Sequence, residues 1–325
     1  MAVQPRPRVV FSKCLGFEAC RWNGVVIDDP FVAALASRVE ITALCPEAEI
    51  GLGIPRDPVR VALDPDTGER ELYQPATGGR HGSAMRAWVA ARVAELGDGP
   101  DGFLLKNRSP SCGFRDVKVY RGFVPAAGSG IGAGFWGEAV LARWPGHPVE
   151  DEGRLKNFTI REHWLRFLWS LTRFRLAREA GGIDDLVRFH TAEKLLLLSV
   201  NQERMRVLGR VVASHGKRPL AELWVEYEAG LRAAFAAPPK PGAIVNTILH
   251  AFGHYSDRLA APERAHFLSL LEAYRDERVP ASVPLKLLES HAIRFEVAYV
   301  LGQTFLDPYP EELSMISDSG KGRDL

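Results

Sequence analysis

The sequence predicts an α/β N-terminal domain, with an open, largely parallel sheet and flanking helices, followed by an all-α C-terminal domain. The chain has 325 residues, more than one hydrophobic core usually supports, so two domains are expected. In the first half, β-prone runs alternate with helical patterns, as is typical of α/β folds. In the second half, the apolar residues recur at helical spacing. We therefore predict one domain over residues 1–153 and a second over 154–325.

The N-terminal domain is predicted to contain three strands, each leading into a loop that carries a cysteine. The β-prone runs are 8–11, 39–44 and 102–105, and the cysteines that follow them are Cys14, Cys45 and Cys112. Helices are expected at 31–37 and 83–96, between these strands. If the strands are parallel, one edge of the sheet carries all three thiols, and open α/β sheets form their sites at that edge.

The four cysteines all lie within the first 112 residues, and none occurs in the rest of the chain. Cysteines that only fill a core would be expected in both domains, so this distribution favours one shared site. No stretch has the pattern of a signal peptide or a membrane span, so we expect a cytoplasmic protein without a membrane partner. In the reducing cytoplasm, thiols bind metal, react or stay inert rather than forming disulfides. The C-x2-C pair typical of structural zinc is absent, but spacing alone does not identify the metal.

The C-terminal domain is predicted from a series of helical patterns. Helices are expected at 164–178, 186–198, 202–214, 220–235, 244–260, 265–276 and 284–301. After them, residues 314–325 are expected to form a disordered tail.

A basic segment opens this domain, although the whole chain is nearly balanced, with 41 basic and 40 acidic residues. Its candidate RNA-binding residues are Arg154, Lys156, Arg161, Arg166, Arg173 and Arg175, and the aromatic residues among them are Trp164, Phe167, Trp169 and Phe174. Positive charge follows a phosphate backbone and aromatic rings stack on bases, so the segment is a candidate RNA face. Equally, the aromatic residues can form the buried side of an amphipathic helix whose arginines are solvated.

Three ordered motifs stand out in the N-terminal domain. They are S-K-C-L-G-F-E-A-C-R-W-N-G at 12–24, C-P-E at 45–47 and K-N-R-S-P-S-C-G at 106–113. In this order and spelling, over about residues 8 to 153, they resemble the bacterial thiouracil desulfidase family. The resemblance implies that Cys14, Cys45 and Cys112 ligate a [4Fe–4S] cluster, with one iron left open to take the substrate's sulfur. It gives Cys20 no ligand role, and we expect that residue to be packed as a small apolar side chain.

By motif position, the resemblance also implies that Glu47 and Ser109 are a catalytic pair. Replacing sulfur by oxygen on a pyrimidine needs an activated water, and it needs proton transfer as hydrosulfide leaves. Glu47 suits the acid–base step, and Ser109 can hold the water or the base by a hydrogen bond. Lys106 can balance negative charge on the cluster and the sulfur. The alternative for Glu47 and Ser109 is a purely structural role in stabilising turns.

The second domain, over about residues 155 to 313, resembles the helical module often fused behind desulfidase domains. Motifs that carry this resemblance include N-T-I-L-H at 246–250 and G-H-Y at 253–255. The resemblance implies a hydrolase-type enzyme that converts 4-thiouridine in tRNA to uridine with release of sulfide, the helical module binding the RNA. Two alternatives stay open: desulfuration of free thiouracil, and a non-catalytic iron–sulfur protein that binds RNA or senses oxidants.

Two further patterns do not predict a site. The glycine run at 128–134 lacks the G-x-G-x-x-G spacing of dinucleotide-binding loops, so NAD is not expected. His250 and His254 have the spacing of a zinc-protease helix, but position 251 is alanine where that motif needs its glutamate.

Overall fold

The computed structural model describes residues 4–124 and 128–315. The chain divides into two compact units, Met1–Trp164 together with Glu312–Leu325, and Leu165–Glu311. This division falls inside helix α5 (Phe158–Ala180), later than the boundary predicted at residue 153. Most of the tail predicted at 314–325 lies outside the described residues.

The first unit is built on a four-stranded sheet in the order β2-β1-β6-β9. Its strands are β1 (Arg8–Ser12), β2 (Glu40–Leu44), β6 (Gly102–Leu105) and β9 (Val149–Asp151). Every neighbouring pair is parallel, which confirms the predicted parallel sheet. The first three strands are the predicted ones, whereas β9 was not predicted. In register, Val10 of β1 lies between Thr42 and Phe103 of its two neighbours.

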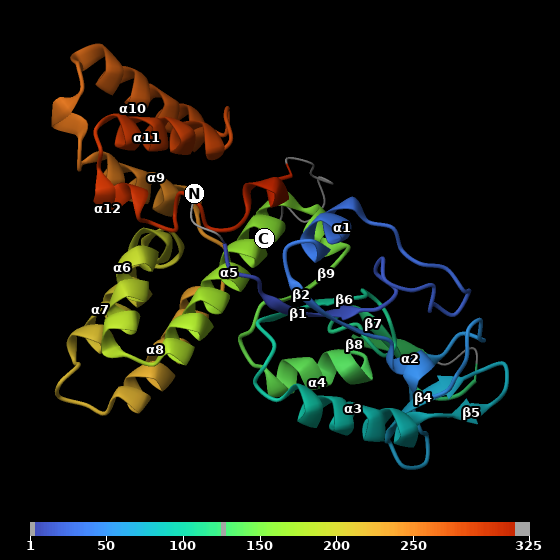
Figure 1. Ribbon diagram of the computed structural model, residues 1–325. Coiled ribbons are helices and arrows are strands. Elements are labelled where there is room, and N and C mark those ends of the chain that lie inside the picture. Colours follow the sequence, from blue (N-terminus) through green and yellow to red (C-terminus); the bar gives the residue numbers. More distant parts are fainter. Residues whose placement is uncertain (1–3, 125–127, 316–325) are drawn as a thin grey trace. The chain divides into compact units, whose positions relative to one another are not determined.

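Helices cover both faces of this sheet, which is why its central strands are almost continuously apolar. The helices are α1 (Pro30–Ala36), α3 (Gly82–Leu96) and α4 (Phe135–Arg143). Val10 and Phe103 belong to the core formed with α3 and α4, which lie side by side on one face (Figure 1). The opposite face is covered by α1, whose Leu35 is buried. Asp29 begins α1 by accepting the backbone N–H of Phe31 at 2.9 Å.

A second, mixed sheet follows in the same unit, in the order β5-β4-β3-β7-β8, and the sequence patterns did not predict it. Its strands are β3 (Arg60–Leu63), β4 (Arg70–Gln74), β5 (Gly79–Arg80), β7 (Val117–Tyr120) and β8 (Ser129–Gly132). The glycine run therefore supplies an edge strand and then the N-cap of α4, Gly134. A short helix, α2 (Pro46–Glu49), stands where only a loop was expected.

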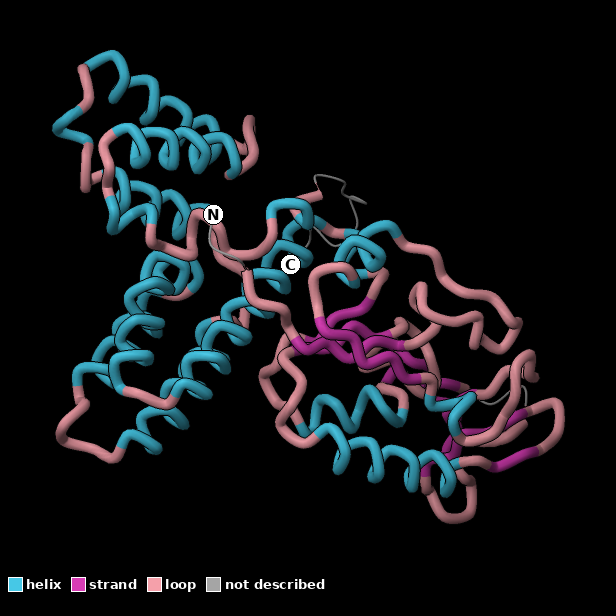
Figure 2. Tube along the Cα trace, viewed as in Figure 1, coloured by secondary structure: helices cyan, strands magenta, loops and turns pink. Residues whose placement is uncertain are grey.

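The second unit is helical, as predicted, and Figure 2 shows its helices joined by loops. Besides α5, its helices are α6 (Ile183–Val200), α7 (Gln202–Ala213), α8 (Leu220–Ala234), α9 (Pro241–Phe252), α10 (Ala261–Arg275), α11 (Ser282–Arg294) and α12 (Ala298–Leu301). The helix predicted over 284–301 is two helices, because Glu296 between them has a left-handed backbone with φ of 54°. No helix in the described ranges has the length and apolarity needed to cross a membrane.

Candidate functional site

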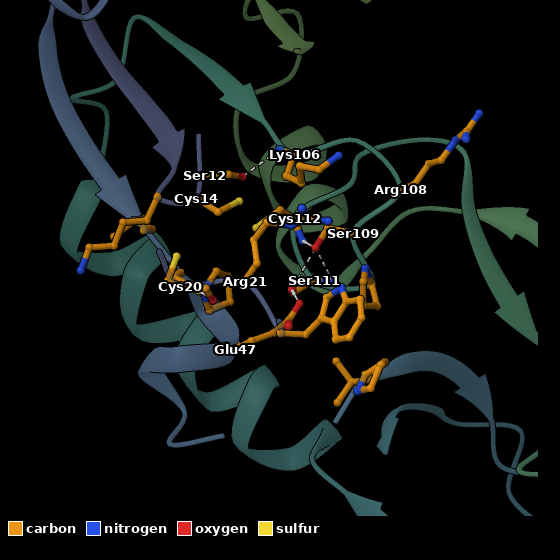
Figure 3. Close-up of a pocket in the computed structure, with 18 of the residues that line it drawn as sticks. Ser12, Cys14, Cys20, Arg21, Glu47, Lys106, Arg108, Ser109, Ser111 and Cys112 are labelled. Carbon is orange, nitrogen blue, oxygen red and sulfur yellow. Dashed lines mark hydrogen bonds between the residues drawn. The ribbon is translucent and has the colours of Figure 1, made fainter. Parts of the chain in front are cut away.

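The carboxyl ends of β1, β2 and β6 open onto a cavity of about 330 Å³. Cys14, Cys45 and Cys112 all line it, as does Cys20. Figure 3 shows cysteine sulfurs around this space. Because the strands are parallel and adjacent, loops that are far apart in the sequence meet at one edge of the sheet. The structure thus brings together the three thiols that the strand pattern predicted to converge.

The Cys112 loop is fixed by hydrogen bonds from within and from α4. Inside the loop, the Ser109 hydroxyl accepts the backbone N–H of Cys112 at 3.1 Å. From outside, the backbone N–H groups of Gly134 and Trp136 donate to the carbonyls of Gly113 at 2.6 Å and Ser111 at 2.8 Å. The loop carbonyls therefore satisfy donors at the start of α4 that would otherwise lack partners.

This close approach requires glycine on the helix. A Cβ atom at Gly134 would lie 2.6 Å from the carbonyl oxygens of Pro110 and Ser111, and one at Gly137 would lie 2.2 Å from that of Gly113. Both distances are shorter than van der Waals contact, so no larger residue fits without moving the loop. Gly134 and Gly137 therefore allow the start of α4 to pack against the loop that carries Cys112.

Cys20 was expected only to be packed in the core, but it also lies beside the predicted ligands. It is buried, and its carbonyl accepts a hydrogen bond from the Cys45 thiol at 3.7 Å. A hydrogen bond with the Cys14 thiol raises the pKa of Cys20 to about 11. Cys20 is therefore both packed and part of the cavity wall, with its thiol beside two of the predicted ligands.

The other buried thiols also hold their protons more tightly than usual. Burial raises the pKa of Cys112 to about 12. The hydrogen bond with Cys20, together with burial, raises the pKa of Cys45 above its ordinary value. At neutral pH these groups are neutral thiols, so binding of a metal centre must displace their protons.

The donor set fits an iron–sulfur cluster. Thiolates are the usual ligands of such clusters, and the cavity presents several thiols on different walls. Within the described part of the chain, no three or more His, Cys, Asp or Glu side chains lie close enough together to hold a single metal ion. A cluster distributes its ligands over several irons, so it does not require such convergence on one point.

Glu47 lies in the first turn of α2, and its buried carboxylate faces the cavity. Arg56 donates to its Oε2 from Nε at 3.1 Å and from Nη2 at 2.6 Å. The Ser111 hydroxyl donates to its Oε1 (Figure 3). Sequence reasoning missed both partners. Ser111 belongs to the S-P-S-C-G motif and could have been found there, whereas no motif contains Arg56.

Ser109 reaches Glu47 through Ser111. The hydroxyls of Ser109 and Ser111 are 3.2 Å apart, and Ser109 also accepts the backbone N–H of Ser111 at 3.3 Å. The predicted pair, Glu47 and Ser109, therefore lies on one wall with a third side chain between its members.

Lys106 lines the cavity, but its charge is compensated by the protein. Its Nζ donates to Glu152 at 2.6 Å and to the carbonyl of Asn107 at 3.0 Å. Its backbone N–H donates to the Ser12 hydroxyl at 2.8 Å, which joins the ends of β6 and β1. These contacts fix the position of Lys106 at the rim of the cavity.

Most of the charged side chains of the basic segment are engaged by other residues of the protein. Three of its arginines form ion pairs: Arg154 with Glu150 at 2.8 Å, Arg173 with Glu193 at 2.6 Å and Arg175 with Glu179 at 3.0 Å. Arg161 is buried and donates to the Leu155 carbonyl at 2.7 Å, Arg166 is half-buried, and Lys156 is exposed. The four aromatic residues, Trp164, Phe167, Trp169 and Phe174, are all buried. The rings are therefore buried, as the amphipathic-helix interpretation expected, and have no access to a base. Its solvated arginines are not found throughout, because Arg161 is buried and the side chains of Arg173 and Arg175 are mostly buried in ion pairs.

Comparison with known proteins agrees with the two-part organisation. Residues 9–152 match the family model of 2-thiouracil desulfurase, and residues 194–310 match DUF1722, a family described as a protein of unknown function. A search of curated proteins gives no match. Among solved structures, the chain is similar to a [4Fe-4S]-dependent thiouracil desulfidase, TudS, with 26% identity over 46% of this chain and 93% of that chain and a TM-score of 0.37. The chain thus carries a 2-thiouracil desulfurase domain, from a family of enzymes that act on carbon–sulfur bonds, followed by a DUF1722 helical region.

Proposed function

We propose that the first unit removes sulfur from a thiolated uracil by hydrolysis, without net oxidation or reduction. In the reaction, the ring C=S group and water give a ring C=O group and hydrogen sulfide. One observation carries the proposal: in a 2-thiouracil desulfurase domain, the Glu47 carboxylate and the cysteine thiols line the same cavity. Reduced thiols suit a reducing compartment, and a cytoplasmic location is part of this proposal.

In this proposal Cys14, Cys45 and Cys112 hold a [4Fe–4S] cluster. When bound, such a cluster supplies a soft Lewis acid at the iron that lacks a protein ligand. The Glu47 carboxylate accepts a proton from the water that attacks the ring carbon, and it returns a proton to the departing sulfur. Ser109 orients that water or the carboxylate through its hydrogen bond to Ser111. Lys106, paired with Glu152, holds the rim of the cavity.

We propose free thiouracil as the first substrate to test, because the family model names that base. The 4-thiouridine of tRNA is the alternative, which the resemblance of the second domain implies. The buried aromatic residues of α5 give the RNA alternative no stacking surface there. Sulfide release by the full chain from thiouracil and from thiolated tRNA, compared at equal concentrations of thiolated base, separates the two.

Anaerobic purification tests the cluster. We expect a coloured protein with about four irons and about four acid-labile sulfides per chain, the composition of a [4Fe–4S] cluster. Serine at Cys14, Cys45 or Cys112 should lower both contents. A colourless protein that contains zinc alone would overturn the cluster assignment.

Glu47→Gln tests the proton transfer. We expect turnover to fall by about 10²- to 10⁴-fold while iron and sulfide contents stay unchanged. Glu95→Gln is the matched control, because Glu95 is exposed on α3 and does not line the cavity. Unchanged sulfide release by Glu47→Gln would remove Glu47 from the mechanism and favour a non-catalytic iron–sulfur protein.

A further inference from the structure

Both oxygens of the Glu47 carboxylate are engaged by buried side chains that lie on different segments. Arg56 binds Oε2 through two of its nitrogens, and Ser111 donates its hydroxyl to Oε1. The side chains of Arg56 and Glu47 are only 4% and 11% exposed. The carboxylate is therefore oriented by fixed neighbours and not by solvent.

We propose that Arg56 and Ser111 are positioning residues that fix the Glu47 carboxylate in one orientation toward the cavity. The inference rests on the proposed function, because orientation affects turnover only if Glu47 takes part in the reaction. The inference extends the proposed function by naming the residues that orient the Glu47 carboxylate for proton transfer. A carboxylate held in place needs less reorganisation when the reaction occurs.

The guanidinium of Arg56 is itself held in one position. Its third nitrogen, Nη1, donates to the carbonyls of Cys20 and Gly53, both at 3.0 Å. Its backbone N–H donates to the Trp22 carbonyl at 2.8 Å. All three guanidinium nitrogens thus have partners, and the side chain links Glu47 to the segment that carries Cys20. A lysine keeps the charge but cannot reproduce this planar set of donors.

Ser111 is fixed as firmly on the other side. It is buried, and its carbonyl accepts the backbone N–H groups of Trp136 at 2.8 Å and Gly137 at 3.3 Å. Its hydroxyl lies 3.2 Å from that of Ser109. The start of α4 therefore sets the place of Ser111, and Ser111 sets the orientation of Glu47. An ionised carboxylate has about four acceptor sites, so Glu47 keeps acceptor capacity for a water.

Turnover of single variants gives the first test. We expect Arg56→Gln, Arg56→Lys and Ser111→Ala each to lower kcat by roughly 10- to 100-fold with little change in KM. Iron and sulfide contents and the visible absorption spectrum should stay those of the unaltered protein. Arg80→Gln is the matched control, because Arg80 pairs with Asp64 at 2.7 Å away from the cavity. Full activity of Arg56→Lys would overturn the claim that donor geometry, and not charge alone, is required.

A double-mutant cycle shows whether Arg56 acts through Glu47. Arg56→Gln should slow sulfide release in the unaltered chain but should have little further effect in the Glu47→Gln chain, measured over long incubations. An equal loss in both backgrounds would mean that Arg56 acts independently and would overturn the proposal.

The same double-mutant cycle can be measured on the free energy of unfolding in urea, which does not depend on activity. Removing either partner leaves a buried charge without compensation, so the double variant should lose less stability than the sum of the singles. Additive losses would overturn the link between the two residues. If the unaltered protein releases no sulfide from either substrate, the proposed function fails, and the unfolding cycle still decides whether Arg56 holds Glu47.

Discussion

Ser111, in the loop after β6, donates its hydroxyl to the Glu47 carboxylate, which lies in the first turn of α2. The two residues are 64 positions apart in the sequence. They meet because β2 and β6 are the two neighbours of β1 and all three strands run in parallel. A parallel sheet places the loops that follow its strands at one edge, so a carboxylate from one loop and a hydroxyl from another share a hydrogen bond.

The loop that carries Cys112 packs closely against the start of α4, and we predict that this packing depends on Gly137. Gly137→Ala adds a Cβ that would lie 2.2 Å from the Gly113 carbonyl, so the loop must move. We expect a loss of roughly 1–3 kcal/mol in unfolding free energy and a lower iron content after anaerobic purification. Gly130→Ala is the control, because a Cβ there meets no atom within 4 Å. Normal iron content and stability in Gly137→Ala would contradict this role.

Lys106 and Glu152 form an ion pair whose side chains are 18% and 9% exposed. Lys106→Met leaves the Glu152 carboxylate buried without its charged partner, although the backbone N–H of Asn107 still donates to it at 3.0 Å. We therefore expect a loss of about 1–3 kcal/mol in unfolding free energy. Lys106→Met combined with Glu152→Gln should recover much of that stability and most of the turnover. A combined variant that is stable but inactive would instead support a catalytic role for the lysine charge.

The sequence predicted the site best where a cysteine directly follows a recognisable strand pattern. The strands before Cys14, Cys45 and Cys112 could be predicted because each is a short apolar run bounded by turn residues. Their parallel arrangement then placed the three thiols together. The mixed sheet was missed because strands such as β5, with two residues, have too little periodicity to be recognised.

The hydrogen-bond partners of Glu47 could not be predicted from local sequence patterns, because neither lies in the motif that contains Glu47. Arg56 looks like any surface arginine in the sequence, since its importance depends on a fold that buries it against Glu47. For the basic segment the sequence misled in the opposite way, by suggesting a binding site where the structure shows contacts within the protein. Its arginines suggested an external ligand, but residues such as Arg173 find carboxylates on neighbouring helices, and that pairing is a property of the tertiary structure.

Arg173 gives a prediction that separates structure from RNA binding. Its partner Glu193 is fully buried, and the Ser170 hydroxyl also donates to that carboxylate at 2.7 Å. Arg173→Gln should therefore cost about 3–5 kcal/mol in unfolding free energy. Arg178→Gln is the matched control, since Arg178 is 47% exposed in its pair with Glu228 and should cost less than about 1 kcal/mol. A loss of tRNA affinity in Arg173→Gln without loss of stability would restore the RNA-face interpretation.

The raised pKa of the Cys112 thiol predicts how the metal-free chain responds to pH. Its pKa rises from an ordinary value of 9.0 to about 12 because the thiol is buried. Below pH 9 the thiol keeps its proton in both folded and unfolded chains, so its contribution to stability is constant there. Above pH 9 the unfolded chain loses this proton while the folded chain keeps it. The free energy of unfolding should therefore fall as pH rises from about 9 toward about 12.

Urea unfolding of the chelator-treated, reduced protein between about pH 7 and about pH 11 measures this dependence. Cys112→Ser removes one of the thiols with a raised pKa, so its unfolding free energy should fall less steeply above pH 9. Part of the slope should remain, because the pKa values of Cys20 and Cys45 are raised as well. An identical slope in both proteins would mean that the Cys112 thiol is open to solvent once the metal is removed. In that case the loop that carries it is held in place by the bound metal and not by α4.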